Sequence, residues 1–172
     1  MLPDIDLRLQ AIAKTLRDIV LPAVPTSEQQ ACEHVELIIG HLGMLEAQWK
    51  VALKFELGTY DSLCALGRKL LPVVDQKALY DELNTRLAAA SSLDRTDYDR
   101  VSAAVKQLGR LLDRVISGDY TTAAMDPRLI DAVLDYGQHE TWRNRVWFAA
   151  SRIDPDAADL PGIESLFRPT YD

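Results

Sequence analysis

Residues 26–71 read TSEQQACEHVELIIGHLGMLEAQWKVALKFELGTYDSLCALGRKLL, and this stretch decides the fold. It contains no proline, and its large apolar residues recur at steps of three and four, which places them on one face of a helix. They are Leu42, Leu45, Trp49, Leu53, Leu57, Tyr60, Leu63 and Leu70. A straight helix over this span would be roughly 65 Å long. We therefore expect two helices or one bent helix, joined at Gly58-Thr59, because glycine weakens a helix.

Helical periodicity extends over most of the remaining chain. The other predicted helices cover residues 5–20, 75–87, 96–117 and 127–152. Residues with short polar side chains precede the helices and are expected to cap them. They are Thr26 and Ser27, Asp75, Asp94 or Thr96, and Asp126. Pro127 suits the first position of the last helix, where its missing N–H is not needed.

The predicted fold class is all-α, an up-and-down bundle of four to six helices with one long or kinked helix over residues 26–71. No segment alternates with period two, so we expect no strands. Residues 1–152 are expected to form a single helical-bundle domain. Residues 153–172 hold three prolines and a glycine, which predicts an extended acidic tail, packed on the bundle or trailing from it, with one turn at Ile163–Phe167.

Composition excludes several classes of function. The 172 residues carry a net charge of −7, which disfavours nucleic acid as a partner because phosphate binding needs clustered Lys and Arg. No apolar run is long enough to span a membrane, and the N-terminus does not resemble a signal peptide. Cys32 and Cys64 lack the spacing of a metal site or a disulfide framework. We expect a cytoplasmic protein with reduced thiols and no cofactor.

One candidate metal site lies early in the long helical stretch, at Glu33, His34, Glu36 and His41. The two histidines are seven residues apart, so both project from the same side of a helix. The Glu-x-x-His spacing of helical-bundle metal sites is missing. A pair of surface histidines is therefore the simpler interpretation.

The second candidate is an aromatic and arginine-rich segment of the last helix. Its residues of interest are Tyr136, His139, Glu140, Trp142, Arg143 and Trp147. Arginines among aromatic rings could bind an anionic ligand or form an interface hot spot. The competing interpretation is that the rings form a core layer of this helix. Glycines within predicted helices, among them Gly67 and Gly109, indicate close approach of another helix.

Residues 38–45, Ile-Ile-Gly-His-Leu-Gly-Met-Leu, resemble a group of uncharacterised bacterial all-helical proteins. The likeness also includes residues 19–25 and 55–57, and it covers about residues 8–70. Proteins of that group are often encoded near acyl-CoA dehydrogenases and aminoglycoside-phosphotransferase-like proteins. The resemblance implies a bacterial, cytoplasmic, all-α protein with an accessory role, and it carries over no catalytic residues.

Three hypotheses of function follow. The favoured one is a non-catalytic helical interaction module that forms a homo-oligomer or binds a protein partner, with no nucleic acid and no membrane involved. The second is a small-molecule binder or enzyme with a pocket between helices near Trp142 and Trp147. The third is a metal-dependent bundle that uses the glutamates and histidines named above.

Overall fold

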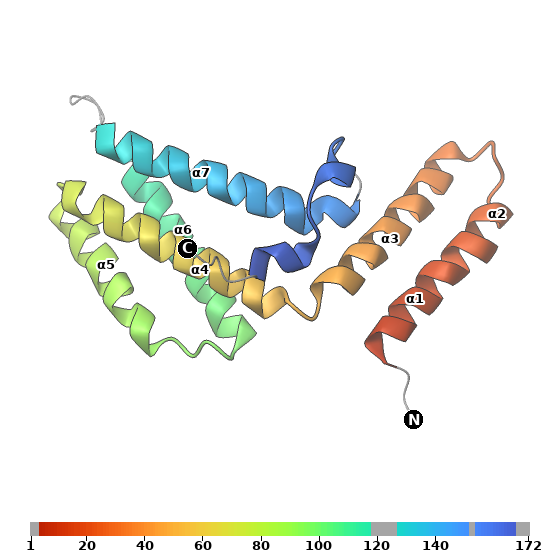
Figure 1. Ribbon diagram of the computed structural model, residues 1–172, viewed down its shortest axis with the longest axis horizontal. Helices are drawn as coiled ribbons and strands as arrows, with labels where there is room; N and C mark the ends of the chain where they lie inside the picture. The colour runs from red at the N-terminus through yellow and green to blue at the C-terminus, as the bar shows by residue number, and fades with distance from the viewer. Residues whose placement is uncertain (1–3, 118–126, 152–153, 168–172) are drawn as a thin grey trace. The chain divides into compact units, whose positions relative to one another are not determined.

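The computed structural model describes residues 4–117, 127–151 and 154–167, and the fold is all-α (Figure 1). No strand occurs in these three ranges. The described parts of residues 1–50 and 143–172 form one compact unit, and residues 51–142 form a second. The two units are considered separately below. None of the described helices is long and apolar enough to cross a membrane.

The first unit is built on an antiparallel helical hairpin. Helix α1 (Ile5–Thr15) continues through a π-helical turn, Leu16–Val20, into the short α2 (Leu21–Ala23), and α3 (Gln29–Gln48) packs against it. The helix therefore ends three residues beyond the predicted position 20, at Ala23. In the π turn the Leu21 N–H bonds the Leu16 carbonyl, a wider ring than that of an α-helix. The helix thus carries Pro22 within α2.

The joint within residues 26–71 lies at residues 49–51, and not at Gly58-Thr59. Helix α3 ends at Gln48, and α4 (Ala52–Leu70) runs through Gly58 without interruption. Two side chains at the joint bind the start of α1. The indole Nε1 of Trp49 donates to Asp6 Oδ1 at 2.7 Å, and the Lys50 ammonium binds the other oxygen of this carboxylate. These tertiary contacts accompany a break that helix propensity does not predict.

The cap residues predicted for three helices are also wrong. Glu28 occupies the cap of α3 and Gln76 that of α5, and neither side chain makes a capping bond. Helix α6 begins after Asp97, whose Oδ1 accepts from the Arg100 N–H at 3.1 Å. Asp94 instead accepts from the backbone N–H and the hydroxyl of Thr96, which holds the turn before the helix. Asp126, the predicted cap of the last helix, lies outside the described residues.

The second unit consists of α4, α5 (Lys77–Ala88), α6 (Tyr98–Ile116) and the first part of α7 (Pro127–Phe148). Helices α4 and α6 form the most extensive contact, and α5 packs against both. Leucines dominate the buried core of this unit. It contains Tyr60, Leu63, Cys64, Leu66, Leu70, Leu79, Leu83, Leu87, Leu108, Leu111, Leu112, Val115, Leu129 and Ala132. The close approach expected at Gly67 is present, since a Cβ there would lie 3.2 Å from Leu87 Cδ2. The close approach expected at Gly109 is wrong, since a Cβ there would meet nothing within 4 Å among the described residues.

The first unit also contains the end of α7 and the segment after it. Helix α7 starts at Pro127, as predicted, but it ends at Phe148 and not at Arg152, and a short 3₁₀ helix follows (Ala149–Ser151). Arg145 binds Asp154 through two hydrogen bonds of 2.7 and 3.2 Å. The turn expected at Ile163–Phe167 is a 3₁₀ helix. The boundary expected between bundle and tail falls on residues 152–153, outside the described residues.

Candidate functional site

The hairpin of the first unit has no buried side chain. Every described residue between positions 4 and 50 is exposed or half-buried, whereas the second unit has a continuous buried core. Many large apolar side chains of the hairpin are exposed. They are Ile5, Leu7, Ile12, Ile19, Val20, Leu37, Ile38, Leu45 and Trp49. Such an accumulation of exposed apolar side chains is typical of an interaction surface.

The exposed residues follow a heptad pattern on both helices. On α1, Leu9 is half-buried, while Ile5 and Ile12 on either side of it are 46% and 50% exposed. On α3, Leu42 is half-buried, while Ile38 and Leu45 are 48% and 51% exposed. Steps of four and three residues are those of the a and d positions of packed helices. On each helix the leucine packs within the hairpin, whereas the apolar residues on either side of it in the sequence are open to solvent.

The two open rows border the same side of the hairpin. Leu9 and Leu42 lie where the two helices of the hairpin contact each other. Ile5 comes four residues before Leu9, and Ile38 comes four residues before Leu42, so Ile5 and Ile38 are rotated about their helix axes in the same sense from that contact. In an antiparallel pair this shared rotation places both rows on one side. We call Ile5, Ile12, Ile38 and Leu45 the open seam. Ile19 continues the seven-residue spacing into the π turn.

Polar contacts hold the base of the hairpin. Gln10 lies on the opposite side of α1 from Ile12 and donates to Glu46 of α3 at 2.5 Å. At the very end, hydrogen bonds from Lys50 and Trp49 lower the pKa of Asp6, and the Lys50 ammonium lies 5.3 Å from the centroid of the Trp49 ring. These contacts fix the antiparallel register and leave the open seam uncovered by other parts of the hairpin.

The residues of the predicted aromatic and arginine-rich segment are divided between the two units. Tyr136, His139, Glu140 and Trp142 belong to the second unit, and Arg143 and Trp147 to the first. Tyr136 and His139 line a shallow pocket of about 230 Å³ between α4 and α7, where Lys69 and Asp135 lie 3.8 Å apart.

The two tryptophans of this segment differ in burial. Trp142 is exposed, whereas Trp147 and Arg143 are buried, and the Trp147 carbonyl accepts a 2.8 Å bond from Gln48. Burial of Trp147 agrees with the interpretation of this ring as core.

The predicted metal ligands are not brought together. Glu33, His34, Glu36 and His41 are all exposed on α3, and Glu33 accepts a hydrogen bond from Gln29 at 2.8 Å. Across the described ranges, no group of three or more His, Cys, Asp or Glu side chains is placed to hold a metal ion.

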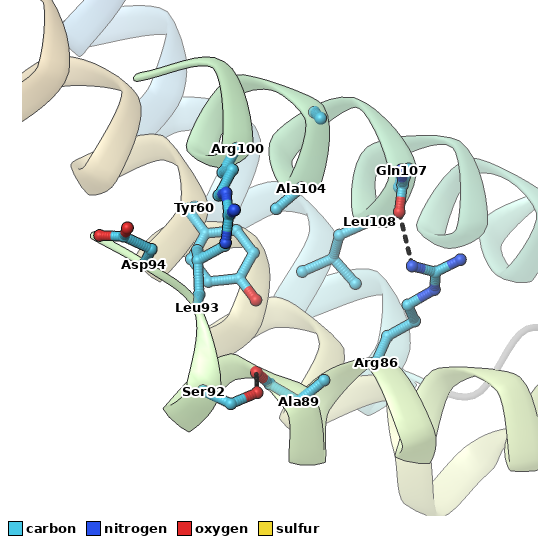
Figure 2. A pocket seen from close by; sticks show the side chains of 11 residues that line it. Tyr60, Arg86, Ala89, Ser92, Leu93, Asp94, Arg100, Ala104, Gln107 and Leu108 are labelled. Carbon is cyan, nitrogen blue, oxygen red and sulfur yellow. Dashed lines mark hydrogen bonds between the residues drawn. The ribbon is translucent and has the colours of Figure 1, made fainter. Parts of the chain in front are cut away.

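A second candidate site, which sequence reasoning missed, is a pocket of about 350 Å³ in the second unit (Figure 2). The end of α5, the turn after it and α6 supply its walls. Leu108 and the small side chains Ala89 and Ala104 form apolar parts of its lining, and Arg86 and Arg100 lie on different sides of Leu108 in the figure. The sequence signal was the spacing of Arg100 and Gln107, seven residues apart on one face of α6.

Tyr60 closes the pocket toward α4 and stays neutral there. Burial, with a further contribution from the neighbouring Cys64, raises the pKa of Tyr60 to about 12. Burial likewise raises the pKa of the Cys64 thiol. Both groups therefore keep their protons at neutral pH. The Tyr60 hydroxyl is hydrogen-bonded to the Cys64 sulfur, and neither side chain supplies a reactive anion.

Comparisons of the chain with protein-family models, with curated proteins and with solved structures found no match.

Proposed function

We propose that this protein is a self-associating helical module, in which the hairpins of two copies pack together through their open seams. The observation that carries the proposal is the matching pattern on α1 and α3. On each helix, half-buried and roughly half-exposed apolar residues alternate at heptad spacing along one side of an antiparallel pair. Packing that side against a second helical pair would complete a four-helix arrangement with the half-buried and the open residues of each helix inside.

A second copy fits this surface because the surface is complementary to itself. In a two-fold dimer the same patch of each copy meets the other, so every open residue acquires an apolar counterpart. The acidic residues of α3, Glu33, Glu36 and Glu46, lie outside the seam positions, so two copies do not oppose rows of like charge.

The available area is sufficient for a dimer. Helix α3 has 20 residues, which makes the hairpin about 30 Å long, and two helices side by side are about 20 Å wide. The resulting footprint is roughly 600 Å² on each copy. The total of about 1,200 Å² reaches the lower end of the range for specific interfaces, about 1,200–2,000 Å². A weak to moderate dimer is therefore expected.

Sedimentation velocity of the full-length protein tests the proposal. Self-association predicts a weight-average sedimentation coefficient that rises with concentration and approaches the value of a dimer. Replacing Ile12 with Asp would place a charge in the seam, and this variant should remain a monomer with unchanged helix content. A wild-type protein that stays monomeric up to millimolar concentration would refute self-association.

A further inference from the structure

We propose that the pocket between α5 and α6 binds a small carboxylate with a compact apolar body, anchored by Arg86. This site is in the second unit and is independent of the hairpin interface. Its volume of about 350 Å³ falls at the lower end of the range for small-molecule sites, roughly 300–1,000 Å³. A compact ligand is therefore implied.

Arg86 is the anchor because no carboxylate of the described residues forms an ion pair with it. Its Nη1 donates to the neutral amide oxygen of Gln107 at 2.5 Å, which orients the guanidinium at the pocket (Figure 2). The carboxylates nearest to it in the sequence are engaged elsewhere. Glu82 accepts from Arg114 at 3.0 Å, and Asp81 pairs with Lys77 at 3.1 Å. A guanidinium held by one neutral partner retains further N–H donors for a ligand carboxylate.

Arg100 has a different role. It forms an ion pair of 3.3 Å with Asp97 through Nε, so much of its charge is already balanced. Two helical turns separate Arg100 from Gln107, about 10 Å along α6, and Ala103 and Ala104 lie between them. One carboxylate group can therefore contact one of the two arginines. The paired Arg100 forms the polar end of the pocket opposite the anchor.

The apolar lining between the two arginines implies that the body of the ligand is apolar. Leu108 is 2% exposed, and the small side chains of Ala89 and Ala104 leave room above it. The carboxylate of Asp94 also lines the pocket, but it accepts two hydrogen bonds from Thr96 and is attracted to Arg100, so it does not pair with Arg86. The apolar floor beside the Arg86 anchor favours an organic anion over an inorganic one, because an inorganic anion would gain nothing from the floor.

Titration of the full-length protein with benzoate, followed by ¹H–¹⁵N NMR, tests this site. We expect saturable shifts of the amide signals of Leu93, Ala104 and Leu108. Benzamide, which has the same shape without the charge, should bind at least tenfold more weakly, and so should sulfate, which lacks an apolar body. Absence of saturable binding by benzoate, or equal binding by benzamide, would overturn the proposal.

A pair of variants locates the anchor. Arg86→Gln should weaken benzoate binding at least tenfold, because it removes the charge that the carboxylate pairs with and the charge-assisted hydrogen bonds of the guanidinium. Arg110→Gln removes the same charge from an exposed position of α6 that does not line the pocket, and it should leave binding unchanged. Equal loss in both variants would show a general charge effect and would refute the assignment of Arg86.

Discussion

Shortening two residues of the open seam should dissociate the dimer while the chain stays folded. In the double variant Ile12→Ala, Ile38→Ala, each substitution removes three side-chain carbons. Full burial of these atoms is worth about 2.4 kcal/mol at ~0.8 kcal/mol per carbon. The two side chains are 50% and 48% exposed in the single chain, so about half of this, roughly 1.2 kcal/mol, depends on the partner. A symmetric dimer contains four such sites, which gives about 5 kcal/mol.

A loss of about 5 kcal/mol corresponds to an increase of more than three orders of magnitude in the dissociation constant. Sedimentation equilibrium measures the constant, and circular dichroism confirms that the helices remain. The matched control is Leu7→Ala, Leu37→Ala. Both leucines are more than half exposed and lose the same number of carbons, but they lie on the outer sides of α1 and α3. An increase below tenfold in the seam variant, or equal increases in both variants, would refute the reasoning.

Three further predictions concern stability and pH. Trp147→Ala should lower the free energy of unfolding by about 3–5 kcal/mol in urea titrations, because the ring is buried; a loss below 1 kcal/mol would contradict its role as core. Gly67→Val should destabilise the chain by about 1–3 kcal/mol, because even the Cβ added at this position would lie 3.2 Å from a leucine methyl. Gly109→Ala should stabilise the chain by up to about 1 kcal/mol, because a Cβ at Gly109 would meet nothing within 4 Å among the described residues. The pKa of Asp6 is lowered, chiefly by its bond with Lys50, so this contact stabilises the hairpin above the unfolded pKa and is lost as pH falls through the lower folded value. An NMR titration in which the Asp6 carboxyl carbon shows no lowered pKa would contradict that contact.

The sequence predicted the helices well, because their apolar periodicity is a local property. The all-α class, the position of Pro127 at the start of α7 and the break within residues 26–71 could all be read from it. The place of the break could not. The break was expected at Gly58 because glycine has a low helix propensity, yet α4 continues through this residue. The chain turns instead where Trp49 and Lys50 bind Asp6. Such contacts join residues more than forty positions apart and leave no local signal.

The candidate sites also combine features that are visible in the local sequence with features that depend on contacts between distant residues. The heptad spacing of Ile5, Leu9 and Ile12 is visible in the sequence, but only the hairpin geometry shows that Leu9 packs inside while the isoleucines stay open. Arg86 and Gln107 meet because α5 and α6 are neighbours, so this pocket could not be predicted from spacing alone. The aromatic and arginine-rich segment was singled out from its composition, and composition could not show that Trp142 is exposed while Trp147 is buried.

The most direct test of the proposed dimer is to observe contacts between the methyl groups of two copies. In a sample that mixes isotope-labelled and unlabelled protein, nuclear Overhauser effects can be restricted to those that cross from one copy to the other. Self-association predicts such effects at Ile12, Ile38 and Leu45, and none at Leu7 or Leu37. Intermolecular effects confined to the outer leucines, or none at a concentration where the protein sediments as a dimer, would contradict the assignment of the interface to the open seam.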